Sequence, residues 1–213
     1  ILCTESNFEN CIKLLDDLPL SKFAAIRVQD IGAAEGVRHE LPEIPIHFIA
    51  ETGNHNLTGL MRWHEYFGQQ LQRFALSSEL PKSTLINYCR SLTVPCEILA
   101  AGRILLFYTP RKLLGNYESS KNSFVFNEKR LVPSDQPQRQ FPTLENQHGT
   151  FMYHHKDLFL LDFIPELQNT RLKVLRLDFR HLDIKSDLMK KIDSLLGSFD
   201  KQTVRSLKSK WPS

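Results

Sequence analysis

The sequence is poor in the features that mark several special classes of protein. Its 213 residues include four cysteines and nine glycines, too few for a disulfide scaffold or a collagen-like chain. No run of about 18 apolar residues occurs, so we expect no membrane-spanning helix. The formal net charge of +3 is too small to indicate nucleic-acid binding by itself. What is left is a globular composition, with 41% hydrophobic residues.

The cysteines and the first residues indicate a cytoplasmic protein. The four cysteines are Cys3, Cys11, Cys89 and Cys96. Their spacing matches no CxxC metal motif and no secreted disulfide framework, so we interpret them as reduced thiols that mostly pack in the core. Residues 1–4 lack the charged segment and long apolar run of a signal peptide. Because the sequence begins with Ile1, we expect a processed chain or part of a longer one.

Helical and strand patterns alternate along most of the chain, which predicts an α/β fold with parallel strands. Apolar residues at helical spacing, and apolar runs between them, define the two kinds of segment. The predicted helices are residues 4–18, 31–41, 57–71, 81–92, 156–167 and 188–199. The predicted strands are residues 23–29, 44–49, 74–76, 94–101 and 172–179.

Residues 115–155 break this alternation. Helical spacing disappears there, prolines recur, and short apolar segments alternate with polar ones, which indicates a β-rich antiparallel insertion or long hairpin loops. A closed barrel of eight βα units needs about 250 residues. We therefore predict one TIM-barrel-like α/β domain over residues 1–213 that is incomplete, or whose first units precede this sequence.

Five segments resemble, in their order and spacing, the bacterial collagenase-like peptidase family U32. They are residues 25–32, 46–56, 76–80, 96–111 and 145–167. The resemblance implies a TIM-barrel-like catalytic domain. It implies either peptidase activity or a part in the oxygen-independent hydroxylation of RNA bases or ubiquinone precursors. In the hydroxylation branches it further implies cysteine-bound iron–sulfur clusters and, for some members, prephenate as the oxygen donor.

This sequence departs from the family pattern where the cluster ligands would be. The first ligand cysteine normally follows a Tyr-Ser-x-Arg turn, but residues 108–111 read Tyr-Thr-Pro-Arg and are followed by Lys112. No cysteine occurs after Cys96, and a cluster usually needs four thiolates. Ala101 stands where relatives often carry His or Tyr, and Ser78 stands where they often carry Arg. We therefore expect no iron–sulfur cluster and no other cofactor.

Polar residues that follow the predicted strands are the candidate site residues, because barrel enzymes place their sites at these strand ends. The acid/base candidates are Glu51, His55 and Glu79. The ligand-binding candidates are Gln29, Asp30, Asn54, Arg103, Arg111, Asp178 and Arg180. The two arginines Arg103 and Arg111 would supply fixed positive charge to an anion. The alternative is that such groups cap helices, as Asn54 and Asn56 would before residue 57.

Two further patterns have open interpretations. His148, His154 and His155 lie near Tyr153 and suit zinc binding or proton transfer, or else are exposed histidines on a hairpin. No carboxylate or cysteine completes a known ligand spacing, so we predict no metal site. Residues 201–211 form a basic amphipathic segment that docks on a partner, touches RNA phosphates, or packs as an ordinary terminal helix.

The resemblance, taken with these departures, implies a diverged family member that acts in a hydroxylation pathway as an accessory or substrate-binding component. Its partner would be a cysteine-bearing homologue or another protein subunit, and its substrate an RNA base or a quinone precursor. One alternative is a peptidase or hydrolase of the same family, for which the sequence shows no nucleophile and base. The other is a non-enzymatic module that binds a protein partner.

Overall fold

A computed structural model describes residues 5–51, 56–114, 129–131, 134–136, 139–167, 169–179, 186–197, 200–209 and 211. The chain divides into two compact units. The first comprises Ile1–Leu99 and Phe163–Arg176, and the second comprises Ala100–Asp162 and Leu177–Ser213. The prediction of a single domain stays a prediction, and each unit is described by itself. None of the helices in the described ranges is both long and apolar enough to cross a membrane.

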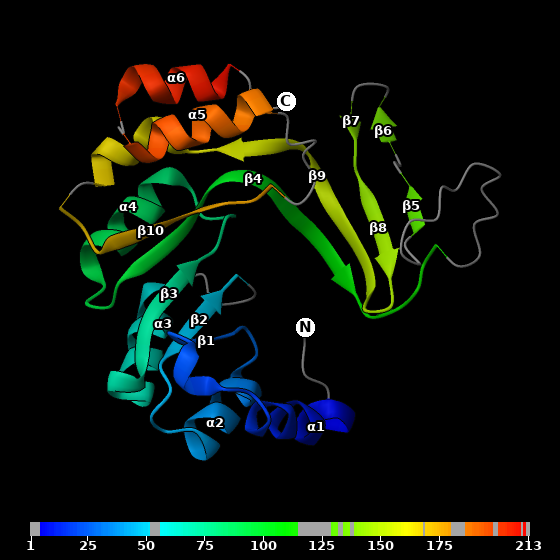
Figure 1. The fold of residues 1–213 in the computed structure, drawn as a ribbon, viewed down its shortest axis with the longest axis vertical. Helices are drawn as coiled ribbons and strands as arrows, with labels where there is room; N and C mark the ends of the chain where they lie inside the picture. The colour runs from blue at the N-terminus through cyan, green and yellow to red at the C-terminus, as the bar shows by residue number, and fades with distance from the viewer. Residues whose placement is uncertain are drawn as a thin grey trace. The chain divides into compact units, whose positions relative to one another are not determined.

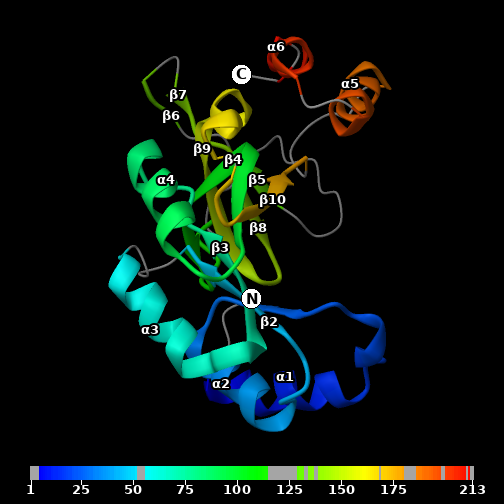
Figure 2. The same cartoon turned by 90° about the vertical axis from the view of Figure 1, so that its left-hand side faces the viewer.

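The first unit is built from alternating strands and helices, as the sequence predicts (Figure 1). In chain order they are β1 (Ile26–Val28), α2 (Ile31–Glu40), β2 (Ile46–Ala50), α3 (Leu57–Phe67), β3 (Leu71–Leu76), α4 (Lys82–Ser91) and the start of β4 (Cys96–Thr109). The pairs β1–β2, β2–β3 and β3–β4 are all parallel. Helices α3 and α4 lie along one face of these strands (Figure 2). The mixed α/β class is therefore confirmed.

Side chains explain where these helices begin. Asp30 accepts a hydrogen bond from the Ala33 backbone N–H at 2.8 Å at the start of α2. Asn56 does the same for Gly59 at 2.6 Å at the start of α3. Each cap satisfies an N–H that the helix itself leaves without a partner. Asn56 therefore has the capping role that the sequence suggests.

The first unit also contains elements that flank these strands. Helix α1 (Glu5–Asp16) packs on α2, where Phe8 and Ile12 lie so close to Gly36 that a larger residue would clash with them. The 3₁₀ turns are η1 (Leu20–Lys22), η2 (Gly68–Gln70) and η3 (Leu161–Leu167), of which the last begins in the second unit. Strand β1 is shorter than the predicted 23–29, because the Phe23 N–H bonds back to the Leu20 carbonyl and pairing with β2 covers only residues 26–28.

Strand β10 (Leu172–Leu177) pairs with β4. The Cys96 backbone N–H donates to the Arg171 carbonyl at 2.7 Å. Further along, in the second unit, the Asp178 N–H donates to the Ala101 carbonyl at 2.9 Å. Residue numbers increase in the same direction along both strands between these two bonds, so β10 runs parallel to β4. The predicted strand 172–179 is confirmed, although it ends two residues earlier.

The second unit is an antiparallel sheet with two terminal helices. Its strands are β4 from Ala100 onward, β5 (Lys129–Leu131), β8 (Thr143–Asn146) and β9 (Gly149–Phe159), with a separate pair β6 (Ser134–Gln136) and β7 (Arg139–Gln140). The helices are α5 (Ser186–Gly197) and α6 (Lys201–Lys208). Antiparallel strands occur within the described part of the predicted β-rich insertion, and β4 and β9 extend this sheet to residues before 115 and after 155.

The predicted helix over residues 156–167 is wrong in its first part. Strand β9 continues to Phe159, and a 3₁₀ helix follows over Leu161–Leu167. The pairing of Arg103 with Asp157 and of Gly102 with Leu158 holds these residues in the sheet. Long-range pairing with β4 thus overrides a local helical pattern, which sequence spacing does not reveal.

Candidate functional site

The first unit carries charged side chains in the middle of its strands, where apolar residues are usual. Arg27 of β1 lies beside His47 of β2, which lies beside Arg73 of β3. Ala75, two residues beyond Arg73, lies beside Glu97 of β4. Residues two apart on a strand point to the same face. These charged residues and His47 therefore share one face of the sheet.

The opposite face of the same strands is apolar. Phe48, Phe74 and Cys96 are each next to one of these polar positions in sequence, and all three are fully buried. The ring centroid of Phe48 lies 6.2 Å from that of Trp63 and 6.5 Å from that of Phe67, both on α3. Helix packing thus accounts for the apolar face and leaves the polar face without that role.

Glu97 is the centre of the polar face. Only 2% of the residue is exposed. Arg27 donates two hydrogen bonds to its carboxylate, from Nη1 to Oε2 at 2.7 Å and from Nη2 to Oε1 at 2.9 Å. Nη1 of Arg73 lies 3.6 Å from the same Oε2. One buried carboxylate therefore holds a bidentate arginine and a second arginine nearby.

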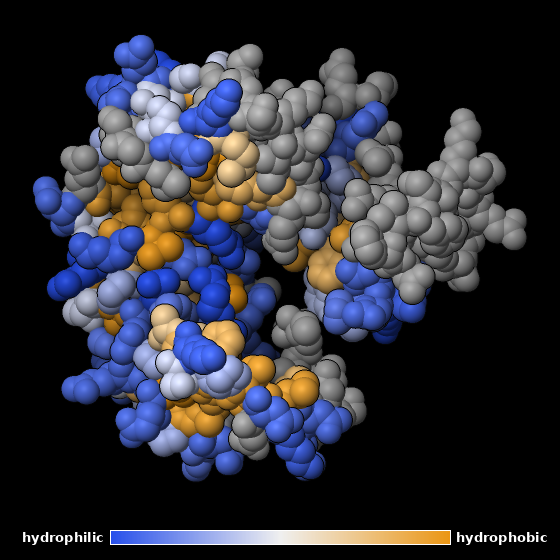
Figure 3. All heavy atoms as spheres, in the orientation of Figure 1, coloured by the Kyte–Doolittle hydropathy of each residue, from blue (hydrophilic) through white to orange (hydrophobic). Residues whose placement is uncertain are grey.

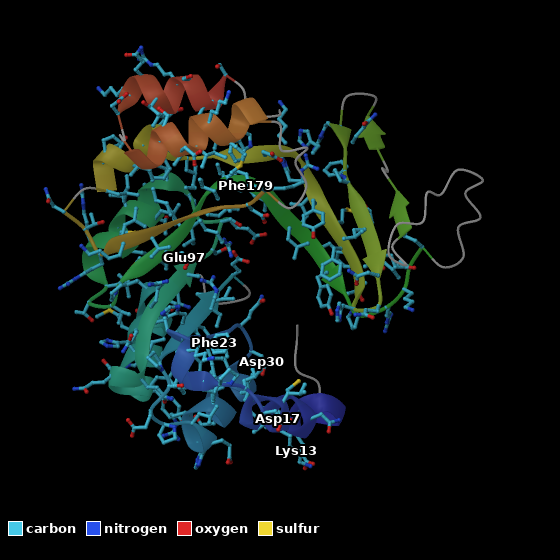
Figure 4. The ribbon with its side chains drawn as sticks, viewed as in Figure 1. Lys13, Asp17, Phe23, Asp30, Glu97 and Phe179 are labelled. Atoms are coloured by element: carbon cyan, nitrogen blue, oxygen red, sulfur yellow. The ribbon has the colours of Figure 1, made fainter. Side chains whose placement is uncertain are left out.

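A second ion pair extends this group. Nη2 of Arg176, on β10, donates to Oε1 of Glu51 at 2.7 Å, and the charge of Arg176 also acts on Glu97. We call these six residues the arginine–glutamate cluster: Arg27, His47, Glu51, Arg73, Glu97 and Arg176. Figure 4 labels Glu97 among the side chains that stand on the sheet, and Figure 3 shows hydrophilic side chains between apolar ones on this face of the first unit.

The cluster contains donors without acceptors. Among the described residues, the buried Nε atoms of Arg73 and Arg176 have no hydrogen-bond partner. A buried N–H without a partner costs free energy, roughly 1–3 kcal/mol each. A ligand that brought acceptor oxygens to these two atoms would remove that cost.

The neighbouring charges shift the pKa values of the cluster. Burial by itself would raise the pKa of Glu97, but the hydrogen bonds from Arg27 and the charges of Arg27, Arg176 and Arg73 together lower it. The hydrogen bond from Arg27 to Glu97 raises the pKa of Arg27, against the effect of burial. Burial, with the charges of Arg73 and Arg27, lowers the pKa of His47. At neutral pH, Glu97 is ionised and His47 is neutral.

The charge balance of the cluster favours an anion. Three guanidinium groups face two carboxylates, which leaves one positive charge while His47 is neutral. Guanidinium groups bind carboxylate and phosphate oxygens through paired N–H donors in a fixed geometry. The cluster can therefore hold and orient an anionic group. Glu97 positions the arginines, because its oxygens already accept their hydrogen bonds.

Comparison with known proteins shows which family the chain belongs to. A model described as peptidase family U32 matches residues 1–189, which is most of the chain. The chain belongs to peptidase family U32. A tRNA hydroxylation protein P2 from Bacillus subtilis (strain 168) is 22% identical over 155 residues, which cover 70% of this chain and 49% of that protein. This chain thus spans about half the length of the curated relative it matches. No solved structure matches it.

The described cysteines of this U32 chain do not fit an iron–sulfur cluster. Cys89 and Cys96 are buried, and their thiols contact each other. That contact and burial both raise the pKa of Cys96, while the contact lowers the pKa of Cys89, so the pair does not offer a cluster two thiolates. Cys11 lies on α1 and is half-buried. Lys112, at the position of the first family ligand, is exposed. No described group of three or more His, Cys, Asp or Glu side chains is arranged to hold a metal.

The structure brings one of the sequence-predicted residues of the first unit into the cluster. Glu51 is there through its bond to Arg176. Asp30 caps α2 instead, which is the structural alternative noted for it. Glu79 is exposed in the loop after β3, where its N–H donates to Ser77 Oγ at 3.2 Å. Gln29 is half-buried between β1 and α2. The catalytic roles of Glu51 and Glu79 stay predictions.

The other predicted residues belong to the second unit or lie outside the described residues. Arg103 donates from Nε to buried Asp157 at 2.9 Å. Arg111 is exposed after β4. Asp178 follows β10 and lies against Gly102, where its Cβ would be 2.7 Å from an added Cβ. Asn54, His55 and Arg180 lie outside the described residues.

The three histidines of the second unit do not share one environment. His148 is exposed next to the β8–β9 turn. The rings of His154 and His155 have their centroids 4.2 Å apart, and both lie beside Phe141. His154 accepts a hydrogen bond at Nδ1 from the Lys156 N–H at 3.1 Å. The exposed-hairpin interpretation therefore describes His148 alone.

Sequence reasoning missed five of the six cluster residues. Arg27, His47, Arg73, Glu97 and Arg176 each lie inside a strand, whereas the acid/base and ligand-binding candidates follow predicted strand ends. The signal was available: an ionisable residue interrupts every one of these apolar runs. Charges are rarely buried without a partner, so several such interruptions in neighbouring strands indicate a shared polar site.

Proposed function

We propose that this chain is a substrate-binding component of an oxygen-independent hydroxylation that acts on RNA bases, with its parallel strands forming part of a TIM-like barrel. The arginine–glutamate cluster would lie on the face that points into that barrel. It would hold the anionic group of a reactant. The chain would not carry an iron–sulfur cluster itself, and a cysteine-bearing partner would supply that chemistry.

Three observations support this proposal. The chain belongs to a family whose resemblance implies such hydroxylations, and its curated relative is named as a tRNA hydroxylation protein. The described thiols do not offer a cluster its ligands. The observation that carries the proposal is the pair of buried Nε donors on Arg73 and Arg176 beside the ionised Glu97, since donors in this arrangement suit an anion.

The residues would divide the work in a definite way. Nη1 of Arg73 lies near the Glu97 carboxylate, and Nη2 of Arg176 donates to Glu51. Each arginine would therefore use its Nε to bind the ligand. Arg27 is occupied by its two bonds to Glu97 and holds that carboxylate in place. Neutral His47 carries no net charge, but its ring can donate one hydrogen bond and accept another.

Ligand binding is tested by the melting temperature of the purified full chain with and without prephenate, the dicarboxylate that the family resemblance implies. A ligand present at 100 times its dissociation constant stabilises the folded state by about 2.7 kcal/mol. We expect a clear upward shift for the wild type, a loss of most of it in Arg73→Met, and no change in Arg62→Met. Arg62 is an apt control because its pair with Glu65 is exposed.

Arg73→Lys separates charge from geometry. Lysine keeps the positive charge but lacks Nε and the planar fork, so we expect it to lose most of the prephenate shift as well. Phosphate serves as the second probe. A shift of equal size with phosphate would show a general anion site, and no shift with either probe would contradict the assignment of the cluster to ligand binding.

The pathway is tested in cells. We expect deletion of the gene to remove a hydroxylated nucleoside from tRNA, measured by mass spectrometry of digested tRNA. A wild-type copy should restore it, Arg62→Met should also restore it, and Arg73→Met should not. Unchanged tRNA in the deletion strain, together with a loss of ubiquinone, would contradict the RNA proposal and favour the quinone branch.

A further inference from the structure

The antiparallel sheet of the second unit exposes a run of apolar side chains. We call β4 from Ala100, β5, β8 and β9, with residues 110–114 and 139–142, the arm. Three consecutive residues of β4 are exposed: Leu105 by 40%, Leu106 by 43% and Phe107 by 43%. The pairing of β4 with β9 shifts register over these residues, and a bulge of this kind re-aims side chains out of the regular alternation. A contiguous run of exposed apolar side chains indicates an interaction surface.

Aromatic rings gather at two places along β9. The ring centroids of Tyr108 and Phe151 are 4.8 Å apart, and the Tyr108 hydroxyl donates to the His148 carbonyl at 2.9 Å. Three or four residues further along β9, His154 and His155 lie against Phe141. At about 3.3 Å per residue, the two groups are roughly 10 Å apart.

The charges of the arm have one sign at its surface. Its exposed charged side chains, within the described residues, are Arg111, Lys112, Arg139 and Lys156. The guanidinium of Arg139 also lies 5.8 Å from the centroid of the Phe141 ring. Each of the four cations lies within four residues, along the chain, of a ring in one of the two groups.

The carboxylates of the arm are turned inward. Glu145 is 3% exposed and accepts hydrogen bonds from the Leu114 N–H at 2.6 Å and the Thr150 hydroxyl at 3.0 Å. Asp157 accepts from Arg103 at 2.9 Å and from Trp211 Nε1 at 2.9 Å. Both described acidic side chains of the arm are therefore bound internally, and its exposed charged side chains, among those that the structure describes, are all positive.

From this combination we infer that the arm binds a single-stranded segment of RNA, with bases stacked on its rings and phosphates on its exposed cations. Stacking on aromatic side chains beside a basic surface is how proteins hold unpaired bases. A protein partner would call for a more continuous apolar patch and tolerate acidic neighbours. The inference rests on the proposed function for the identity of the nucleic acid, but it concerns a different surface.

Binding is measured by fluorescence anisotropy with the full chain, a labelled transcript of a tRNA and a labelled RNA duplex of equal length. We expect the transcript, which has unpaired loops, to bind at least about tenfold more tightly than the duplex. Arg111→Ser with Lys112→Ser should weaken binding of the transcript by roughly tenfold at 0.1 M salt and lower the slope of log affinity against log salt by about two.

The matched control changes the same charge on a different basic surface. Lys201 and Arg205 are exposed on α6, so Lys201→Ser with Arg205→Ser removes two positive charges outside the arm. We expect it to change the affinity less than twofold. An equal loss of affinity in both double variants would show that only net charge matters and would overturn the assignment to the arm. A larger loss in the α6 variant would overturn it as well.

Phe107→Ser tests stacking at the exposed ring next to Tyr108 in β4. This side chain is exposed, so its replacement should leave the melting temperature nearly unchanged. A base stacked on an aromatic ring contributes about 1–3 kcal/mol, so we expect a fivefold or greater loss of affinity with an unchanged salt slope. Unchanged affinity in Phe107→Ser and in the Arg111 and Lys112 variant would overturn the inference.

The cellular tRNA measurement separates this inference from the proposed function. If deletion of the gene leaves tRNA hydroxylation intact while the arm variants still weaken RNA binding, the proposed function fails and the arm inference stands. If deletion abolishes hydroxylation but the arm variants bind the transcript as the wild type does, the arm inference fails and the proposed function stands.

Discussion

Glu97 shows how a single buried residue organises the cluster. An isolated buried carboxylate is strongly unfavourable, and this one is acceptable because Arg27 meets it with two hydrogen bonds and Arg73 lies close by. The reverse is also true, because the arginines depend on the carboxylate for their position. Replacing any one of the three residues therefore leaves charge unbalanced at a buried place.

We expect Glu97→Gln to lower the free energy of unfolding by about 2–3 kcal/mol, below the 3–5 kcal/mol typical of a fully buried pair because Arg27 is partly exposed. Chemical denaturation with urea measures it. Glu65→Gln is the matched control: Glu65 pairs with Arg62 on an exposed helix surface, so the change should be at most about 0.5 kcal/mol. Equal effects in the two variants would show that Glu97 is not the centre of the cluster.

At the scale of elements, β4 is the strand that takes two kinds of partner. Its first half pairs in parallel with β3 and β10, and its second half pairs antiparallel with β9. The register shifts where these second pairs form, between Arg103 and Phe107. The same strand therefore carries Glu97 in the first unit and the exposed side chains of the arm in the second.

The hairpin of β8 and β9 depends on one glycine. Gly149 has φ of +125°, a conformation that side chains with a Cβ rarely adopt. A Cβ at this position would also collide with the Thr109 carbonyl and lie 2.8 Å from the Pro110 Cα. Backbone atoms cannot move aside cheaply, so the residue after the β8–β9 turn must be glycine.

We expect Gly149→Ala to lower the melting temperature markedly, with a loss of about 2–4 kcal/mol from backbone strain and the clash. Differential scanning calorimetry provides the measurement. Gly68→Ala is the control, because Gly68 has φ of +56° but nothing within 4 Å of an added Cβ, so the clash is absent and only the conformational cost of about 1–3 kcal/mol remains. Similar losses at both sites would mean that the hairpin relaxes around the methyl group.

At the scale of the whole molecule, protonation links the cluster to stability. His47 has a lowered pKa in the folded state, so below about pH 6.5 the unfolded chain binds a proton that the folded chain does not. Stability therefore falls as pH falls from about 6.5 toward the folded pKa of His47. The groups that face His47 are Arg73, Arg27 and Glu97.

We expect urea denaturation between pH 7.5 and pH 5.5 to show this decline, with a slope of at most about 1.4 kcal/mol per pH unit for one proton. His47→Gln should remove part of the slope. Below about pH 4.5 we expect a second decline in stability. The lowered pKa of Glu97 means that its ionised form stabilises the fold, and this stabilisation is lost as the carboxylate takes up a proton. A slope that His47→Gln leaves unchanged would assign the decline to other histidines.

The metal content of the full chain is a second property of the whole molecule. We expect protein purified without oxygen to contain iron and acid-labile sulfide far below stoichiometric amounts, because Lys112 cannot replace a thiolate and Cys89 and Cys96 are buried against each other. A visible spectrum is recorded alongside. Stoichiometric iron and sulfide would overturn the proposal that a partner supplies the cluster.

The alternation of strands and helices could be predicted from the sequence because it depends on local apolar spacing, and the structure has it from β1 to β4. The caps at Asp30 and Asn56 are equally local. The continuation of β9 through residues 156–159 could not be predicted in this way, because its hydrogen bonds go to β4, about 50 residues earlier in the chain.

The candidate site likewise has a part that local sequence predicts and a part that depends on long-range pairing. Sequence reasoning reached Glu51, at a strand end, and family membership through motifs that each lie within a short segment. The sequence by itself determined which residues are charged and which strands they interrupt. Only the tertiary structure decided that Arg27, Arg73, Glu97 and Arg176 meet, because the registers of β1 to β4 and the pairing of β10 place residues from positions 27 to 176 on one face. That register results from packing the opposite face against the helices, a property of the whole sheet that no single segment contains.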